Sequence, residues 1–260
     1  MFFAGILINS LKIDQLEKKW AARCLFLLVM AISICSNLWP VGDPDFSKFT
    51  EWAGSFNNTS DMYASLLSSN DIALSIISID NIIYCLFFLA VIYVYIFLAV
   101  LYSRIYVGDK SSQSIGSSCL AYLKYLPILI VFSIMVSIPV AVLNWIGLVL
   151  LIYIVPAFYF SPILITLEKK NPVDALAYSY RYSKGVKFSI AWDLVTLFCI
   201  YQTAEWLSLG FLPTASSAAV LLHGFFTAFF VLAMGRMNGI FYDRLRIHPV
   251  VQKTGPMNGL

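Results

Sequence analysis

Charged residues are scarce in this sequence, and their scarcity excludes an ordinary soluble domain. Only 12% of the 260 residues are charged, whereas 60% are apolar or aromatic. A soluble domain carries roughly a quarter charged residues. From Tyr125 to Leu167, 43 residues contain no charged side chain and no histidine. Because one span needs about 20 residues to cross about 30 Å of hydrocarbon, this stretch predicts two spans joined by a hairpin near residues 144–147.

Histidines, catalytic motifs and metal-binding cysteine spacings are also scarce. His223 and His248 are the only histidines, and the sequence contains no GxSxG, HExxH or Gly-rich phosphate loop. The five cysteines form no CxxC or Cys/His pattern, so we expect no metal site, no cofactor and no enzymatic activity. Buried, reduced thiols are expected, with a disulfide between Cys35 and Cys85 as the alternative. The net charge of +3 is scattered over short loops, which excludes a nucleic-acid-binding patch.

The apolar residues gather in stretches of the length that a membrane span requires. These stretches predict an all-α polytopic membrane protein whose six transmembrane helices form a single membrane domain over residues 1–246. The predicted spans are 22–40, 82–102, 125–143, 147–167, 189–209 and 216–236. An outer loop is expected at 41–81, and a flexible cytoplasmic tail at 247–260.

The basic residues predict the orientation of these spans. If the N-terminus is cytoplasmic, 16 of the 17 Lys and Arg residues fall on the inner side, and only Lys48 lies outside. Short cytoplasmic loops carry such an excess of basic residues, so both termini are expected to be cytoplasmic. A cleaved signal peptide is the alternative for residues 1–40, but no small-x-small cleavage site follows the apolar run. We therefore expect an uncleaved first span.

Short amphipathic segments precede the first, third and fifth spans, at 5–19, 112–124 and 172–184. They predict interfacial helices, and hence three units of interfacial helix, outward span and returning span. The Leu-Ala-Tyr sequence at 120–122 recurs at 176–178. An ancient internal repeat would explain this recurrence, and independent interfacial helices are the alternative.

Segment 172–184 has the clearest helix signals of the three. Asn171 is a suitable N-cap, Pro172 suits the first turn, and Gly185 can end the helix. An apolar stripe is formed by Val173, Leu176, Ala177 and Tyr180. Contacts with anionic headgroups are expected from Arg181, Lys184 and Lys187. We therefore expect membrane lipids to be partners of this chain.

Three stretches around this segment carry a resemblance to a known family. They are residues 161–169 (SPILITLEK), 175–179 (ALAYS) and 183–185 (SKG). They resemble the signature of the YciC-like family of uncharacterised bacterial inner-membrane proteins, which belongs with the membrane domains of some glycerophosphodiester phosphodiesterases. The resemblance covers roughly 80–245 in span order, although family members often open the fourth span with Pro-Gly where this chain has Ile146-Gly147. It implies a bacterial inner membrane and six spans, and it implies no catalytic residues.

Polar side chains within the last two spans are the strongest candidates for a site. Gln202 and Glu205 are three residues apart, hence on one helical face, and His223 lies at similar depth on the returning span. Such a cluster can bind a proton or cation, or it can simply hold two helices together by hydrogen bonds. Asp193, near the inner end of the fifth span, is expected to reach headgroups or to pair with Lys187.

Two further patterns leave alternatives open. The carboxylates of Asp43-Pro44-Asp45 have the spacing of a cation-binding pair, but a solvated turn around Pro44 is favoured. The sixth span carries small residues at helical spacing, which are Gly224, Ala228, Gly235 and Gly239. They predict close helix packing, either with another span of the same chain or with a protein partner or second copy.

Together these features predict a membrane module that interacts with lipid or with a protein partner. The alternative is a small proton- or cation-linked transporter that uses Glu205 and His223. Six spans without a clear discontinuous helix or an inverted repeat count against the transporter.

Overall fold

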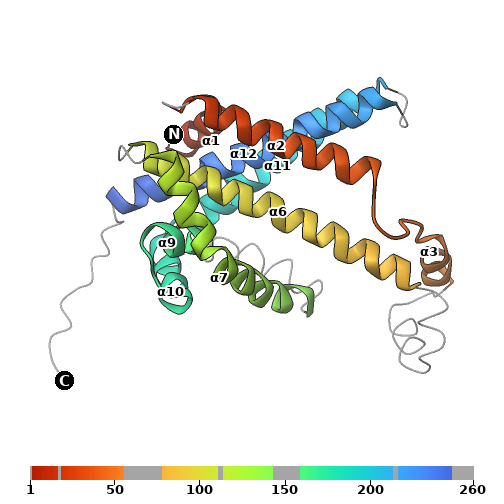
Figure 1. Cartoon of the computed structure of the whole chain (residues 1–260), viewed down its shortest axis with the longest axis horizontal. Helices are drawn as coiled ribbons and strands as arrows, with labels where there is room; N and C mark the ends of the chain where they lie inside the picture. Colours follow the sequence, from red (N-terminus) through yellow and green to blue (C-terminus); the bar gives the residue numbers. More distant parts are fainter. Residues whose placement is uncertain are drawn as a thin grey trace.

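The computed structural model describes residues 2–16, 19–55, 78–110, 114–142, 159–212 and 216–247. All regular structure in these ranges is helical, as the sequence predicts. The helices, labelled as in Figure 1, are α1 (Phe2–Ser10), α2 (Lys19–Leu38), α3 (Ser47–Gly54), α6 (Ile79–Lys110), α7 (Ile115–Val142), α9 (Ser161–Leu167), α10 (Pro172–Ser183), α11 (Lys187–Leu209) and α12 (Ser217–Ile247).

Three of the described helices are long and apolar enough to cross a membrane. They are α2, the Ile79–Gly108 part of α6 and the Ser217–Leu245 part of α12. The prediction of a membrane protein is confirmed at this level. Of the predicted fourth span and its hairpin, residues 143–158 lie outside the described residues, as do 56–77 of the outer loop and 248–260 of the tail.

Helix α12 packs against α2, α6 and α11, and helices α7 and α9 contact α6. In Figure 1, α2 runs antiparallel to α6 and α12. One end of the bundle therefore contains the start of α2, the end of α6 and the end of α12. This end carries basic residues and is called the inner end; the opposite end is called the outer end.

The small residues of α12 allow this close packing, and they do so within the chain. A methyl group added to Gly235 would collide with the carbonyl oxygen of Ala99 on α6. Ser103 of α6 donates a hydrogen bond of 2.5 Å to the carbonyl oxygen of Gly235 at the same crossing. Gly224 lies against Ile34 of α2, and Gly239 lies against Tyr106 of α6, while Ala228 is fully buried. Contacts within the chain thus occupy the four small positions.

Two long helices extend further inward than predicted. The predicted spans end at residues 102 and 236, whereas α6 continues to Lys110 and α12 to Ile247. Arg104 and Arg236, assigned by their charge to inner loops, lie instead inside these helices, and each is only 6% exposed. A buried guanidinium is tolerated where backbone carbonyls accept its hydrogen bonds, and both side chains have such acceptors.

Two of the three predicted interfacial helices differ from expectation. Helix α1 covers Phe2–Ser10 instead of 5–19, and residues 11–16 form turns that expose their carbonyls to hydrogen bonding. The predicted segment 112–124 is not separate, because α7 runs without a break from Ile115 to Val142. Tyr122 explains this continuity: it is buried against α6, and its hydroxyl donates to the carbonyl oxygen of Phe97 at 2.7 Å.

Helix α10 begins and ends where its local signals predict. It starts at Pro172 and ends at Ser183, and Gly185 follows with a positive φ of 86° that glycine adopts without strain. Asn171 occupies the N-cap position, but its side chain makes no capping hydrogen bond. The buried face of α10 consists of Ala175, Ser179 and Ser183, and Ser179 Oγ accepts the backbone N–H of Phe160 at 3.1 Å. The stretches that carry the family resemblance therefore form the packed unit of α9 and α10.

Candidate functional site

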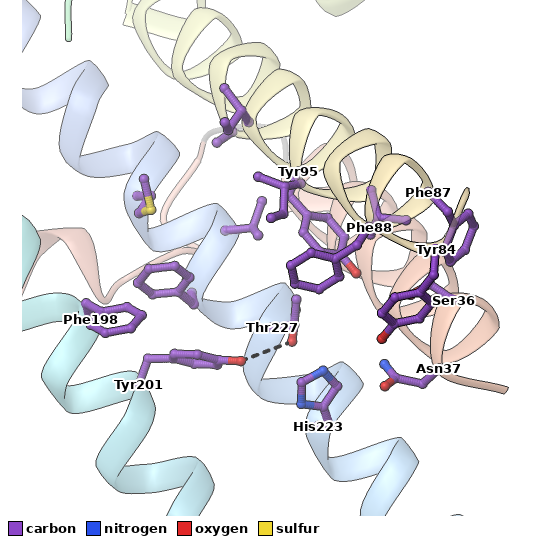
Figure 2. Close-up of a pocket in the computed structure, with 17 residues that line it drawn as sticks. Ser36, Asn37, Tyr84, Phe87, Phe88, Tyr95, Phe198, Tyr201, His223 and Thr227 are labelled. Atoms are coloured by element: carbon purple, nitrogen blue, oxygen red, sulfur yellow. Dashed lines mark hydrogen bonds between the residues drawn. The ribbon is translucent and has the colours of Figure 1, made fainter. Parts of the chain in front are cut away.

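A cavity of about 510 Å³ lies between α2, α6, α11 and α12. One wall is the face of α6 from Tyr84 to Ala99, and the opposite wall is the face of α12 from His223 to Met234 (Figure 2). This volume falls within the roughly 300–1,000 Å³ of small-molecule sites. Phe88 lines the cavity and is also 55% exposed, so the cavity opens on the outer surface of α6.

The cavity exists because α6 and α12 pack closely near Gly235, whereas bulky side chains hold them apart toward the outer end. Helices α6 and α12 cross closely where Ala99 meets Gly235. Toward the outer end, aromatic side chains of α6 replace small ones. The outer loop holds α6 there, because Asn81 donates hydrogen bonds to the carbonyl oxygens of Asp43 and Asp45 at 2.8 and 2.9 Å.

Several polar groups of the cavity lie at its outer end, whereas Tyr95, Tyr201 and Thr227 lie further inward. Asn37 of α2, Tyr84 of α6 and His223 of α12 lie near one another in Figure 2. Within the described part of the chain, the hydroxyls of Tyr84 and Tyr95 make no hydrogen bond, so both can bind a ligand. The inner end, around Ala99, is apolar.

One wall of the cavity is stiffened by aromatic contacts between α11 and α12. The ring of Tyr201 stacks on Phe230 with centroids 4.8 Å apart, and Phe198 meets the same Phe230 at 6.1 Å. The hydroxyl of Tyr201 lies 3.4 Å from Thr227 Oγ1 (Figure 2). Tyr201 is therefore already engaged within the protein, in contrast to Tyr84.

Glu205 and His223, two of the three predicted cluster residues, meet in the structure. Nδ1 of His223 contacts Oε1 of Glu205, and the two side chains are 33% and 13% exposed. Gln202 is exposed, and no hydrogen bond among the described residues joins it to this pair. The predicted cluster is thus a pair, whose histidine faces the cavity.

The predicted headgroup residues lie on or just beyond α10. Arg181 and Lys184 are exposed, while Nζ of Lys187 lies 3.7 Å from the centre of the Tyr180 ring. Val173, at the start of the predicted apolar stripe, is 77% exposed, and Tyr180 is also exposed. Three of the four stripe residues therefore face away from the protein, whereas Leu176 packs against the core, and the fully buried face of α10 consists of small side chains.

Asp193 does not behave as expected. Its side chain is nearly fully buried at the inner end of α11, and Oδ2 has no hydrogen-bond partner among the described residues. It makes no ion pair with Lys187. The expectation that it reaches headgroups or pairs with Lys187 is wrong, because the packing of α11 against α1 and α12 buries this face of the helix.

The carboxylates of the outer loop form a turn, as favoured. Oδ1 of Asp43 accepts the backbone N–H of Asp45, and Oδ1 of Asp45 accepts that of Ser47, each at 2.9 Å. The Ser47 N–H holds the pKa of the Asp45 carboxyl below its usual value. In the ranges described, no group of three or more His, Cys, Asp or Glu residues has the arrangement of a metal site.

The cysteines are free, and Cys35 and Cys85 are not joined. The expectation of buried thiols is wrong for these two and for Cys24 and Cys199, which are exposed on the protein surface. The apolar character that suggested burial in protein is equally suited to a surface in contact with lipid.

Sequence reasoning missed several residues at both ends of the helical bundle. At the inner end, Arg104 donates to the carbonyl oxygen of Thr166, and Tyr102 donates to that of Ile13 at 2.6 Å. Along the cavity, no sequence signal distinguishes Tyr84 and Tyr95 from other aromatic residues. The helical pattern that continues past Arg104 was the one available signal.

No family model, curated protein or solved structure matches this chain, so its candidate site is assigned on the geometry described above.

Proposed function

We propose that this chain is a non-enzymatic lipid-binding module of the bacterial inner membrane, with six spans and both termini in the cytoplasm. Besides α2, α6 and α12, helices α7 and α11 have 28 and 23 residues. At about 1.5 Å per residue, both exceed the roughly 30 Å of the hydrocarbon core. The predicted fourth span, 147–167, completes the six, and α9 forms its inner end.

The orientation is supported by the shared inner end of the long helices. Lys19, Lys110 and Arg244 belong to the ends of α2, α6 and α12 that lie together (Figure 1). Basic residues prefer the cytoplasmic side. Arg181 and Lys184 of the inner α10 segment follow the same rule, and the exposed Val173 and Tyr180 fit an interfacial position for this helix.

The cavity between α2, α6, α11 and α12 is the observation that carries the lipid-binding proposal. It opens on the surface of an apolar helix, so lipid is the solvent that meets its mouth. Its walls are mainly aromatic and aliphatic, and Asn37, Tyr84 and His223 form a polar group at its outer end. An amphiphile has the same division between an apolar chain and a polar head.

Native mass spectrometry of the protein released from mild detergent tests this proposal. We expect a lipid adduct of defined stoichiometry. Val91→Phe, which places a larger side chain in the cavity, should remove it. Val94→Phe is the matched control, because Val94 is exposed on the same helix and does not line the cavity. An adduct lost equally in both variants, or absent from the unmodified protein, would refute lipid binding in this cavity.

Proton-linked transport is the second candidate, and the contact of Glu205 with His223 beside the cavity favours it. Ionisable groups at membrane depth are commonly part of ion or proton pathways. The test is proton uptake into proteoliposomes driven by a potassium diffusion potential and followed by an internal pH dye. Uptake that Glu205→Gln abolishes would establish transport, whereas the same slow leak in both proteins and in empty liposomes would exclude a proton pathway through this pair.

A further inference from the structure

The charge of the cavity points to the class of lipid that it takes. We infer, on the basis of the proposed lipid-binding function, that the cavity holds one acyl chain of a lipid with a zwitterionic, net-neutral headgroup. The headgroup is recognised at the outer end by Asn37, Tyr84 and the Glu205–His223 pair.

The length of the cavity fits one acyl chain. Its α6 wall runs from Tyr84 to Ala99, which is about 22 Å at 1.5 Å per residue. The hydrocarbon core is about 30 Å thick, so the chains of one leaflet occupy about 15 Å. The part of the cavity below Tyr84, in which Tyr95 is the one polar side chain of the described α6 wall, is therefore long enough for the full chain of a lipid of the outer leaflet. The tight crossing of Ala99 with Gly235 closes the space beyond it.

The polar groups occur at the depth of a headgroup. Asn37 belongs to the last turn of α2, and Tyr84 lies in the second turn of α6, so both are close to the outer ends of their helices. The hydroxyl of Tyr84 has no partner in the described ranges. Nδ2 of Asn37 already donates to the carbonyl oxygen of Ser33 at 2.8 Å, which leaves its second N–H. This N–H and the phenol of Tyr84 can each donate to a phosphate oxygen.

The net charge at this end argues against an anionic headgroup. The described lining of the cavity contains no Lys or Arg, and its only ionisable cation is His223. Glu205 contacts that imidazole, so the pair is neutral when the histidine is protonated and negative when it is not. A buried anion without a cationic partner is costly. A headgroup that carries its own ammonium avoids this cost. The ammonium can lie toward Glu205 or over the aromatic rings of α6 that line the cavity.

A competition between two lipids tests this inference. The full-length protein is placed in nanodiscs of equimolar phosphatidylethanolamine and phosphatidylglycerol, and its bound lipid is read by native mass spectrometry after release. We expect at least fivefold enrichment of phosphatidylethanolamine in the fraction that Val91→Phe displaces. Equal retention of the two lipids, or preference for phosphatidylglycerol, would overturn the inference while lipid binding itself stood. If no lipid is displaced by Val91→Phe, the proposed function fails as well.

A change of charge at residue 223 provides the sharper measurement. His223→Lys places a permanent cation beside Glu205, so it should weaken the discrimination against phosphatidylglycerol. Gln202→Lys adds the same charge on α11 outside the cavity and should leave the selectivity unchanged. If His223→Lys does not fold, Tyr84→Phe remains informative, because the Tyr84 hydroxyl makes no hydrogen bond within the described chain. The Tyr84→Phe variant should reduce retention of phosphatidylethanolamine severalfold without altering thermal stability.

Other occupants would be visible in the same spectra. A second copy of the chain seated in the cavity would produce a protein dimer without a lipid adduct, and that result would overturn the inference. An unchanged lipid ratio in both His223→Lys and Tyr84→Phe would show that the outer polar groups do not contact the headgroup, which would overturn it equally.

Discussion

Nε of Arg236 lies 2.8 Å from the carbonyl oxygen of Asn9, although 227 positions separate the two residues in the chain. Nη1 of the same guanidinium donates to the carbonyl oxygen of Gln15 at 2.9 Å, and its centre lies 5.0 Å from the ring of Tyr106. Tyr102 donates to the carbonyl oxygen of Ile13 beside it. The N-terminal segment is thereby fastened to the inner ends of α6 and α12, where its exposed carbonyls stabilise a buried cation.

Replacing Arg236 should therefore weaken the whole inner end. Arg236→Ala removes two hydrogen bonds from a charged donor, each worth about 1.5–3 kcal/mol, so we expect a loss of about 3 kcal/mol in the free energy of unfolding. Hydrogen exchange should show faster exchange in residues 9–16. The control is Arg23→Ala, which removes an exposed guanidinium from α2. Equal stability of the two variants would show that the tie to the N-terminal segment contributes nothing.

The fold was predictable where its signals are local. Pro172 and Gly185 bracket α10, and its observed bounds agree with the predicted segment to within one residue. Helix α11 starts at Lys187 and ends at Leu209, close to the predicted 189–209. The inner extent of α12 was not predictable, because the burial of Arg236 depends on carbonyl groups at the other end of the chain. No pattern within the helix itself indicates that such acceptors exist.

The same distinction applies to the candidate site. The contact of Glu205 with His223 follows from two polar residues at equal depth in apolar helices joined by a short turn. The cavity itself depends on how α6 and α12 pack, through the crossing at Gly235 and the hydrogen bond between Asn81 and the outer loop. Since Tyr84 looks like any aromatic residue in an apolar span, only its position beside this space indicates a role.

The crossing of α6 and α12 should tolerate no added side chain at Gly235. In Gly235→Ala the new methyl group would meet the backbone carbonyl of Ala99, which cannot rotate away, so the helices must separate. Such overpacking typically costs about 1–3 kcal/mol, and it should also weaken the hydrogen bond from Ser103.

Thermal unfolding in detergent measures this effect, and Gly5→Ala supplies the comparison. A methyl group on Gly5 meets nothing within 4 Å, and alanine favours a helix over glycine by up to about 1 kcal/mol. The two glycine-to-alanine changes should therefore move the melting temperature in opposite directions. An unchanged or raised melting temperature for Gly235→Ala would contradict the close crossing.

The stability of the outer loop should depend on pH through the ionisation of Asp45. The backbone N–H of Ser47 favours the ionised carboxyl and lowers its pKa in the folded chain. The stabilisation is therefore fully present above the ordinary pKa of aspartate and is lost as the pH falls through the lowered value. Asp45→Ala should produce at neutral pH the same faster hydrogen exchange at the start of α3 that acid produces in the unmodified protein. Glu51→Ala, a change of an exposed carboxyl within α3, should not.

Helix α10 should bind anionic lipid at the inner surface. A photoreactive diazirine amino acid in place of Val173, which is 77% exposed, should crosslink to phosphatidylglycerol, whereas one in place of the buried Ser179 should not. Each basic residue near an anionic surface contributes about 1 kcal/mol, so the Arg181→Gln, Lys184→Gln variant should lose about 2 kcal/mol, roughly 30-fold in local affinity. Lys48→Gln, a change in the outer loop, should leave the crosslinking yield unaltered. If the crosslinking yield from position 173 is the same in the unmodified protein, the Arg181→Gln, Lys184→Gln variant and the Lys48→Gln variant, then the charge of α10 does not contribute to lipid binding.

Thiol labelling in intact cells should report the orientation of the spans. Lys48→Cys lies in the outer loop and should react with a membrane-impermeant maleimide added outside. Lys184→Cys, just beyond α10, should react only after the membrane is opened. The unmodified protein is the control, because its surface cysteines Cys35 and Cys85 belong to long helices in contact with lipid and should label weakly. An odd number of spans between the two positions places them on opposite sides, whereas labelling of both from outside would require an even number and would exclude the six-span arrangement.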